Sequence, residues 1–156
     1  MPGIDLPQKT IERIWDTIPS VWNQVRNNIH ANAIHDFDIT FIQFRMLRQI
    51  QRGAQTVGSL AEKHQISRPA ISQSVDLLVK KGLITRRQDD KDRRYVKLEM
   101  TEKGERVMTT LMEKNYTWMK EKIANLSHEE LETILNAMSI LQSTLGKPQN
   151  HCLMVK

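Results

Sequence analysis

Side chains that could bind a polyanion gather in one quarter of the chain, between Leu60 and Lys97. This stretch contains ten lysines and arginines but only five aspartates and glutamates, so it carries a net charge of +5. Elsewhere thirteen basic residues balance thirteen acidic ones, so the stretch holds the whole excess charge of the chain. A localised basic patch is typical of proteins that bind nucleic acids, and a solvated charged face is the alternative.

A helix predicted over residues 67–81 would present a row of hydrogen-bonding side chains. Its apolar stripe of Ile71, Val75 and Leu78 faces a core, which leaves polar side chains on the opposite face. Arg68 and Gln73 can each form two hydrogen bonds with the edge of a guanine or an adenine, and serine hydroxyls suit phosphates or bases. The candidate DNA-binding residues of this helix are Ser67, Arg68, Pro69, Ser72, Gln73 and Asp76. A solvated helix face without a ligand is the alternative.

Other kinds of chemistry lack the residues that they need. We find no nucleophile beside a base, no paired carboxylates and no metal-ligand set at usable spacing. The five histidines do not have zinc-ligand spacing with Cys152, the only cysteine. The sequence therefore predicts a protein that is not an enzyme and has no cofactor or metal.

The same composition predicts a cytoplasmic protein. One cysteine cannot form an internal disulfide, which favours a reducing compartment. No apolar run approaches the roughly 20 residues that cross a bilayer, so we expect no membrane partner. The first residues do not resemble a signal peptide.

Changes in hydrophobic period define the elements that position these side chains. Apolar residues recur every three or four positions in helices and alternate in strands. Pro19 interrupts the first helix and predicts either a kink or a new helix start near Thr17. The predicted helices cover residues 7–33, 40–52, 59–64, 67–81, 102–125 and 128–145, and the predicted strands cover 83–87 and 94–100.

Two features of this order suggest how the chain works. The first helix and the last two carry long apolar stripes that one small chain has little core to cover, so we expect burial against a second copy. The helix that ends at Gly82 leads directly into a hairpin with a charged tip. Such a helix fits a DNA major groove of about 12 Å, and a narrow hairpin tip can reach the neighbouring minor groove.

The segment from Gly82 to Gly104 reads GLITRRQDDKDRRYVKLEMTEKG. It resembles the wing signature of the MarR family of bacterial and archaeal regulators, which is roughly G-L-[VI]-x-R, D-x-x-D-R-R and L-T-x-x-G. Residues 39–47, 60–62 and 67–78 resemble the family's second helix and its helix-turn-helix. His64 and Gln65 depart from the apolar–glycine pair usual in the turn, so either Gln65 is strained or the turn differs. Met100 replaces the usual leucine.

The resemblance implies a mainly α fold with a small β wing, a winged helix-turn-helix that forms an obligate-type homodimer through its N- and C-terminal helices. The whole chain, 1–156, would be a single MarR-like domain. Residues 1–36 and 101–146 would form the dimerisation helices, 38–100 the DNA-binding lobe and 147–156 a tail.

The resemblance also assigns residues of the wing. Arg94 aligns with the family's arginine that enters the minor groove, and Asp92 aligns with the acid that orients it. We expect Lys91 and Arg93 to meet phosphates. Arg86 is either a DNA contact or one partner of a structural ion pair beneath the wing.

Relatives often bind a small aromatic molecule in the crevice between the dimer helices and the DNA-binding lobe. The matching candidates on the first two helices are Trp15, Trp22, Phe41, Phe44 and Met46. Ordinary core packing is the alternative, and we favour it for each residue taken singly. The expected partners are therefore double-stranded DNA, a second copy of the chain and a small aromatic or apolar effector.

These expectations describe a sequence-specific regulator of transcription that binds duplex DNA. Within the family's pattern it would be a repressor that a small ligand releases from an inverted-repeat operator. The alternative is a helical protein-interaction module that uses the same apolar stripes and does not bind DNA. The basic hairpin after the helix-turn-helix favours the first interpretation.

Overall fold

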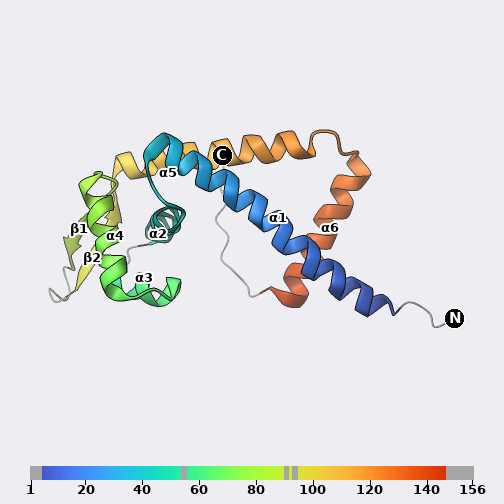
Figure 1. Cartoon of the computed structure of the whole chain (residues 1–156), viewed down its shortest axis with the longest axis horizontal. Coiled ribbons are helices and arrows are strands. Elements are labelled where there is room, and N and C mark those ends of the chain that lie inside the picture. The colour runs from blue at the N-terminus through green and yellow to red at the C-terminus, as the bar shows by residue number, and fades with distance from the viewer. Residues whose placement is uncertain (1–4, 54–55, 90–91, 93–94, 147–156) are drawn as a thin grey trace. The chain divides into compact units, whose positions relative to one another are not determined.

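The computed structural model describes residues 5–53, 56–89, 92 and 95–146. Figure 1 shows the order of the elements in this part of the chain, which is that predicted from the sequence. The elements are α1 (Leu6–Phe37), α2 (Phe41–Gln51), α3 (Val57–His64), α4 (Arg68–Lys80), β1 (Ile84–Gln88), β2 (Val96–Met100), α5 (Glu102–Ile123) and α6 (His128–Leu145). The prediction of a mainly helical fold with a small β wing is confirmed.

The chain divides into two compact units, residues 1–119 and 120–156. The first unit contains the helix-turn-helix, the wing, α1 and most of α5. The second contains the last turn of α5 and the whole of α6. Among the described residues, no helix is long and apolar enough to cross a membrane.

Helix α1 is longer than predicted. It continues without interruption through Pro19, so the predicted helix start near Thr17 is wrong. A proline removes one backbone hydrogen bond, here the one to the carbonyl of Trp15. Both residues are exposed, so water can hydrate that carbonyl. The helix ends at Phe37, where Asp38 adopts a left-handed conformation (φ 52°) and donates its N–H to the carbonyl of Ile34 at 3.0 Å.

The core of the first unit lies where the helix-turn-helix, the wing and the ends of α1 and α5 meet. Phe44, Leu47 and Ile50 of α2 are all buried there. Helix α2 starts at a capping box formed by Thr40 and Gln43, as its sequence allows. The other core residues are Ile29, Ala33, Ile39, Met46, Leu60, Ala61, Ile71, Val75, Leu78, Leu83, Ile84, Leu98, Val107, Met108 and Leu111.

A tight junction connects α4, β1 and α5. Gly82 ends the α4 segment in a left-handed conformation (φ 71°), which glycine adopts without steric cost. The Thr101 hydroxyl donates to the carbonyl of Gly82 at 2.6 Å and accepts from the N–H of Gly104 at 3.0 Å. Gly104 packs against the backbone of Leu83, since a Cβ at position 104 would lie 2.1 Å from the Leu83 carbonyl oxygen. This contact gives a physical reason for the threonine and the glycine of the L-T-x-x-G pattern.

The wing is a two-stranded antiparallel sheet whose strands are shifted from the predicted ranges. Strand β1 pairs with β2 from Ile84 opposite Met100 to Gln88 opposite Val96. The predicted ranges of 83–87 and 94–100 are therefore off by one residue at the start of the first strand and by two at the start of the second. Leu83 is buried before the strand starts, and Tyr95 lies outside β2 in the turn.

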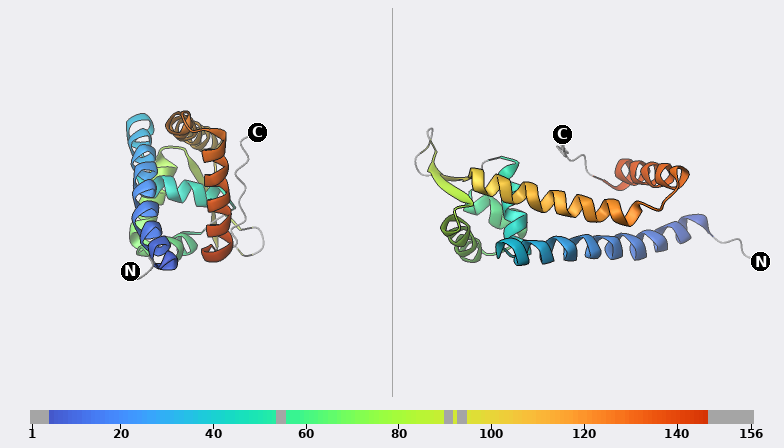
Figure 2. Two further views of the ribbon diagram at one scale, coloured as in Figure 1. Left: turned by 90° about the vertical axis from the view of Figure 1, so that its right-hand side faces the viewer. Right: turned by 90° about the horizontal axis from the view of Figure 1, so that it is seen from above.

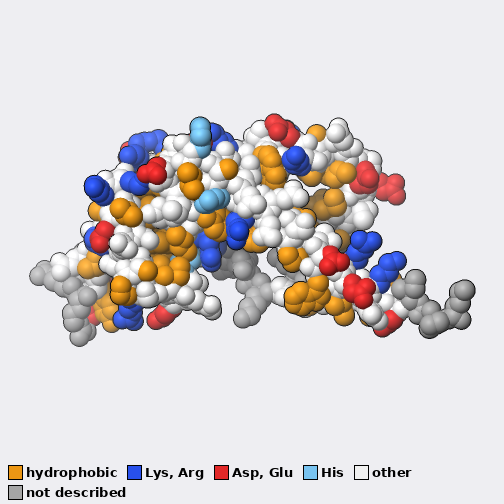
Figure 3. All heavy atoms as spheres, viewed as in Figure 1, with side chains coloured by type: hydrophobic (Ala, Val, Ile, Leu, Met, Phe, Trp, Pro, Cys, Tyr) orange, Lys and Arg blue, Asp and Glu red, His pale blue; other side chains and the backbone are white. Residues whose placement is uncertain are grey.

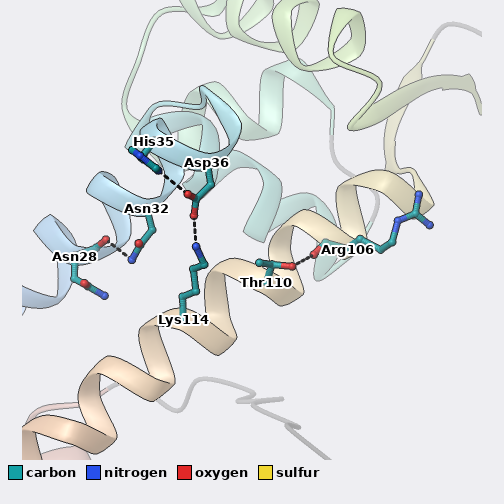
Figure 4. A network of polar contacts seen from close by, with 7 residues as sticks. All are labelled: Asn28, Asn32, His35, Asp36, Arg106, Thr110 and Lys114. Carbon is teal, nitrogen blue, oxygen red and sulfur yellow. Dashed lines mark hydrogen bonds and ion pairs between the residues drawn. The ribbon is translucent and has the colours of Figure 1, made fainter.

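Polar contacts link α1 to α5, which lie side by side in Figure 2. Asn28 donates to the side-chain oxygen of Asn115 at 3.2 Å, and Lys114 pairs with Asp36 at 2.6 Å. Figure 4 shows Asp36 between Lys114 and His35. The hydrogen bonds from His35 and Lys114 lower the pKa of Asp36. The aspartate therefore stays ionised and holds the end of α1 against α5.

Helix α6 belongs to the second unit and begins as predicted. The Ser127 hydroxyl accepts from the N–H of Glu130, and the Glu130 carboxylate accepts from the N–H of Ser127, so the two residues form a capping box. The backbone N–H of Ser127, and then its side chain, stabilise the carboxylate and lower the pKa of Glu130. No described residue of α6 is buried, although the helix carries Ile134, Leu135 and Met138. The described part of this helix therefore presents apolar side chains at its surface.

Candidate nucleic-acid interface

Helix α4 has one apolar and one polar face, as predicted. Ile71, Val75 and Leu78 are buried in the core. The opposite face is open to solvent, with Ser72 half-buried and the other candidates exposed, namely Ser67, Arg68, Pro69, Gln73 and Asp76. The helix therefore presents polar side chains to any partner that approaches from outside.

The start of α4 combines two features of its sequence. Ser67 occupies the N-cap position, as predicted, but its side chain accepts no capping hydrogen bond. Its hydroxyl is therefore not committed to the helix. Pro69 lies in the first turn, where its missing N–H has no cost.

Arg68 lies back toward α3. Its guanidinium is so close to Gly58 that a Cβ on Gly58 would lie 3.7 Å from Nη2. Gly58 belongs to the first turn of α3, where backbone N–H groups favour anions and disfavour cations. The guanidinium of Arg68 and the N-terminal turn of α3, which both favour anions, therefore lie close enough together to bind the same phosphate.

The turn between α3 and α4 is strained where the sequence departs from the family pattern. Gln65 has a left-handed backbone (φ 54°, ψ 42°), which costs a residue with a Cβ about 1–2 kcal/mol. Its N–H donates to the carbonyl of Glu62 at 3.2 Å, and the next N–H, of Ile66, donates to Ala61 at 3.1 Å. Of the two alternatives for this turn, the structure shows the strained Gln65. Helix α3 itself starts at Val57, two residues before the predicted Ser59, because Thr56 and Ser59 form a capping box.

An ion pair connects the outer face of α4 with the wing. Arg86 Nη2 on β1 lies 2.6 Å from Asp76 Oδ1 on α4, and both side chains are substantially exposed. The sequence left Arg86 as either a DNA contact or one partner of an ion pair, and the structure shows the ion pair. Its partner is a residue that we expected to contact DNA.

The tip of the wing is organised by Asp89, which the sequence analysis did not single out. Its carboxylate accepts from the N–H of Asp92 at 3.2 Å and pairs with Lys97 of β2. Its own N–H donates to the carbonyl of Tyr95 at 2.9 Å. An aspartate that bonds a backbone N–H a few residues on is a known turn-former, so the spacing of Asp89 and Asp92 was the available signal.

Asp92 is the one predicted tip residue within the described part of the chain. Its carbonyl accepts from the N–H of Tyr95 at 3.0 Å, which closes the turn at the wing tip. Lys91, Arg93 and Arg94, also predicted as DNA contacts, lie outside the described residues.

The five predicted ligand-binding residues differ in how far they are buried. Phe44 and Met46 are fully packed in the core, as the alternative interpretation held. The ring of Phe41 is half-buried and lies 6.0 Å from that of Phe44, with Arg26 over its face. Trp15 is 74% exposed and Trp22 is 53% exposed on the first half of α1. Hydrophobic side chains also reach the visible surface in Figure 3.

A cavity of about 360 Å³ lies elsewhere, at the junction of α1, α4 and α5. Lys81 holds this junction together, because its ammonium donates to the carbonyl and the carboxylate of Asp38 at 2.5 and 2.6 Å. Lys103 donates to the carbonyl of Lys81 at 2.8 Å. The lining residues are His35, Asp36, Phe37, Asp38, Lys81, Leu83, Lys103 and Val107. Within the described residues there is no group of three acidic, histidine or cysteine side chains that could hold a metal ion.

Comparison with known proteins places this geometry among transcriptional regulators. The family model of the MarR family matches residues 37–94, which run from the end of α1 to the wing. The uncharacterized HTH-type transcriptional regulator YpoP of Bacillus subtilis is 31% identical over 122 residues, which cover 78% of this chain and 85% of YpoP.

Solved structures show the same fold. A MarR family protein from Bacillus stearothermophilus superposes with a TM-score of 0.77 at 22% identity, covering 90% of this chain and 98% of that protein. Streptococcus pneumoniae FabT, solved in complex with DNA, superposes with a TM-score of 0.68 at 20% identity, covering 85% of this chain and 95% of FabT.

Proposed function

The chain belongs to the MarR family of HTH-type transcriptional regulators, and from this premise we propose that it is a repressor which binds an inverted-repeat operator as a homodimer. The observation that carries the proposal is the outer face of α4, whose polar side chains are exposed next to a basic wing. A helix of 13 residues is about 20 Å long, and its width suits a major groove of about 12 Å. The solved complex of FabT with DNA supports duplex DNA as the partner.

Helix α4 supplies the base contacts in this proposal. Gln73 is exposed at the middle of the polar face and can bond the N6 and N7 edge of an adenine. Arg68 meets a guanine edge or, from its place over Gly58, a phosphate. The remaining candidates fix the helix in the groove through hydroxyl or apolar contacts, namely Ser67, Pro69 and Ser72.

The wing supplies contacts outside the half-site. Arg94 enters the minor groove and Asp92 orients it, while Lys91 and Arg93 neutralise phosphates. An arginine in a narrow minor groove favours A·T-rich sequence because the negative potential is stronger there. The pair of Arg86 and Asp76 holds β1 to α4, so that the wing and the reading helix approach DNA at a fixed spacing.

A second copy of the chain covers the apolar helices in this proposal. Residues 1–36 and 101–146 form the dimer, and residues 38–100 form the DNA-binding lobe, with 147–156 as a tail. The support is the exposed apolar side chains that α1 and α6 each carry, among them Ile11, Ile18 and Leu135. A two-fold dimer then presents two copies of α4 to two half-sites.

Ile11→Asp should convert the protein from dimer to monomer, because the change places a charge in the proposed apolar interface, to which exposed Ile11 of α1 belongs. The wild-type chain should sediment as a dimer at about micromolar concentration. Gln24→Asp is the matched control, since it adds the same charge at an exposed polar position of α1. A wild-type monomer, or equal behaviour of the two variants in sedimentation velocity, would contradict the proposal.

A small aromatic or apolar effector releases the operator in this proposal, and its site is the crevice beside α1 and α2. Trp15, Trp22 and Phe41 are the accessible candidates, and Phe44 and Met46 support them from the core. Because the proposed target is the cell's own operator DNA, the protein acts in the cytoplasm.

Salt dependence separates DNA binding from a purely helical interaction module. Binding to a 30-base-pair duplex should weaken steeply between about 50 and 200 mM salt, because cations that contact phosphates release counterions. A gel-shift titration over this range is the measurement. If no duplex is shifted even at low salt while the chain still forms dimers, the chain is an interaction module and the proposal fails.

A further inference from the structure

We propose that His64 makes the helix-turn-helix of α3 and α4 sensitive to acid, so that protonation of its ring opens the motif. His64 is the last residue of α3, immediately before the turn that leads to α4. His64 therefore belongs to the part of the molecule that we propose contacts the bases of DNA. Its use in regulation rests on that proposed function, but the opening itself does not.

The side chain of His64 is buried without hydrogen bonds. His64 is only 9% exposed, and within the described part of the chain neither nitrogen of its ring has a hydrogen-bond partner. Buried polar atoms without partners are rare in folded proteins, because each one loses its hydrogen bonds to water without replacing them. A neutral imidazole tolerates this site better than a charged one, because burial of an unpaired charge costs far more.

The surroundings of the ring oppose its protonation. The charged groups that act on it are both cations, Arg45 from α2 and Lys63 from α3 itself. The side of α4 that faces the core is apolar, with Ile71 and Val75 buried there. Burial, and then these two cations, lower the pKa of His64 below its ordinary value. No acid among these neighbours compensates the charge.

The turn beside His64 is where the motif can open at least cost. Gln65 is already held in a left-handed conformation that disfavours a residue with a Cβ. Once protonated, the ring gains by moving into water at the C-terminal end of α3, where the helix dipole favours a cation. Movement of the ring into water and relaxation of the left-handed backbone at Gln65 would both release the end of α3 from the core.

The direction of the pH effect follows from linkage. Because the pKa is lower in the closed motif, the open form binds more protons, so the motif is most stable above about pH 6.5 and loses stability as the pH falls. Between pH 7.5 and pH 5.5 the opening equilibrium should rise by up to about tenfold for each histidine. Affinity for an operator should fall by no more than about this factor for each copy, to the extent that the open form is populated.

Hydrogen exchange of the amides in α3 and at the start of α4 tests the proposal without DNA. After correction for intrinsic exchange rates, the wild type should lose protection by up to about tenfold between pH 7.5 and 5.5. His64→Leu, which places the family's apolar residue type there, should lose none. His30→Gln removes an exposed histidine of α1 as the matched control and should behave like the wild type.

An NMR titration of the wild-type ring gives a second measurement that does not depend on any variant folding. The ring should titrate clearly below pH 6.5. Titration at or above 6.5, or equal loss of protection in the wild type and His64→Leu, would overturn the proposal. If the chain binds no duplex at any pH, the proposed function fails while both measurements still decide whether His64 opens the motif.

Discussion

A Gly104→Ala variant should lose about 3 kcal/mol of unfolding free energy, because the added methyl group would clash with rigid backbone. The new Cβ would lie 2.1 Å from the Leu83 carbonyl oxygen and 3.1 Å from its carbon. That carbonyl accepts the N–H of Thr101, so a shift of Leu83 would also disturb the junction of α4, β1 and α5. Urea denaturation followed by circular dichroism measures the loss.

Gly58→Ala is the matched control for this prediction. A Cβ at position 58 would meet its nearest neighbour, Arg68 Nη2, at 3.7 Å, which is an ordinary contact. Because alanine favours helix over glycine, the control should be neutral or more stable by up to about 1 kcal/mol. Equal destabilisation by both substitutions would mean that the close packing at Gly104 does not explain the glycine.

A Gln73→Ala variant should lose about 1–3 kcal/mol of discrimination at one base position in each half-site. The side chain of Gln73 is exposed on the outer face of α4, where it can form two hydrogen bonds with an adenine edge. Truncation removes both bonds but leaves the charge of the protein unchanged. Affinities for the preferred duplex and for its single-base variants measure the effect.

Lys91→Ala provides the contrast, because a phosphate contact carries no sequence information. This variant should weaken binding to every duplex alike and reduce the slope of affinity against salt by about one charge. If Gln73→Ala instead weakens all sequences equally, as Lys91→Ala should, α4 is not the element that reads bases.

The parts of the fold that depend on a short sequence pattern could be predicted from the sequence. The burial of Ile71, Val75 and Leu78 follows from their helical spacing, and the start of α6 follows from a serine and a glutamate three residues apart. The left-handed backbone at Gln65 was predictable because the family usually has glycine there. Each of these rules acts over a few residues, so tertiary contacts did not override it.

Other boundaries depended on contacts that the pattern does not contain. Pro19 was predicted to disturb α1, but its exposed position lets the helix continue. Helix α3 starts early because Thr56 caps it together with Ser59, a pair outside the usual serine-to-glutamate pattern. The second strand starts later than predicted, at Val96, because Tyr95 belongs to the turn in which its N–H donates to the carbonyl of Asp92.

The candidate site was predicted by residue type but not by side-chain partners. The sequence placed Asp76 and Arg86 in the interface, whereas the pair that they form depends on the distance between α4 and β1. The aromatic residues of α2 were ambiguous for a similar reason, since Phe44 fills the core and Phe41 is only half-buried. Residue type alone does not distinguish a ligand contact from core packing.

Selection of binding sites from random duplexes tests the central claim most directly. The full-length protein should enrich an inverted repeat whose half-site centres lie about 10 base pairs apart, because a two-fold dimer places two copies of α4 in successive major grooves. The positions outside the half-sites should be enriched in A·T pairs, where the wing is proposed to reach the minor groove. Recovery of no common sequence, or of a single half-site without its inverted partner, would contradict the account of a dimeric, sequence-specific regulator.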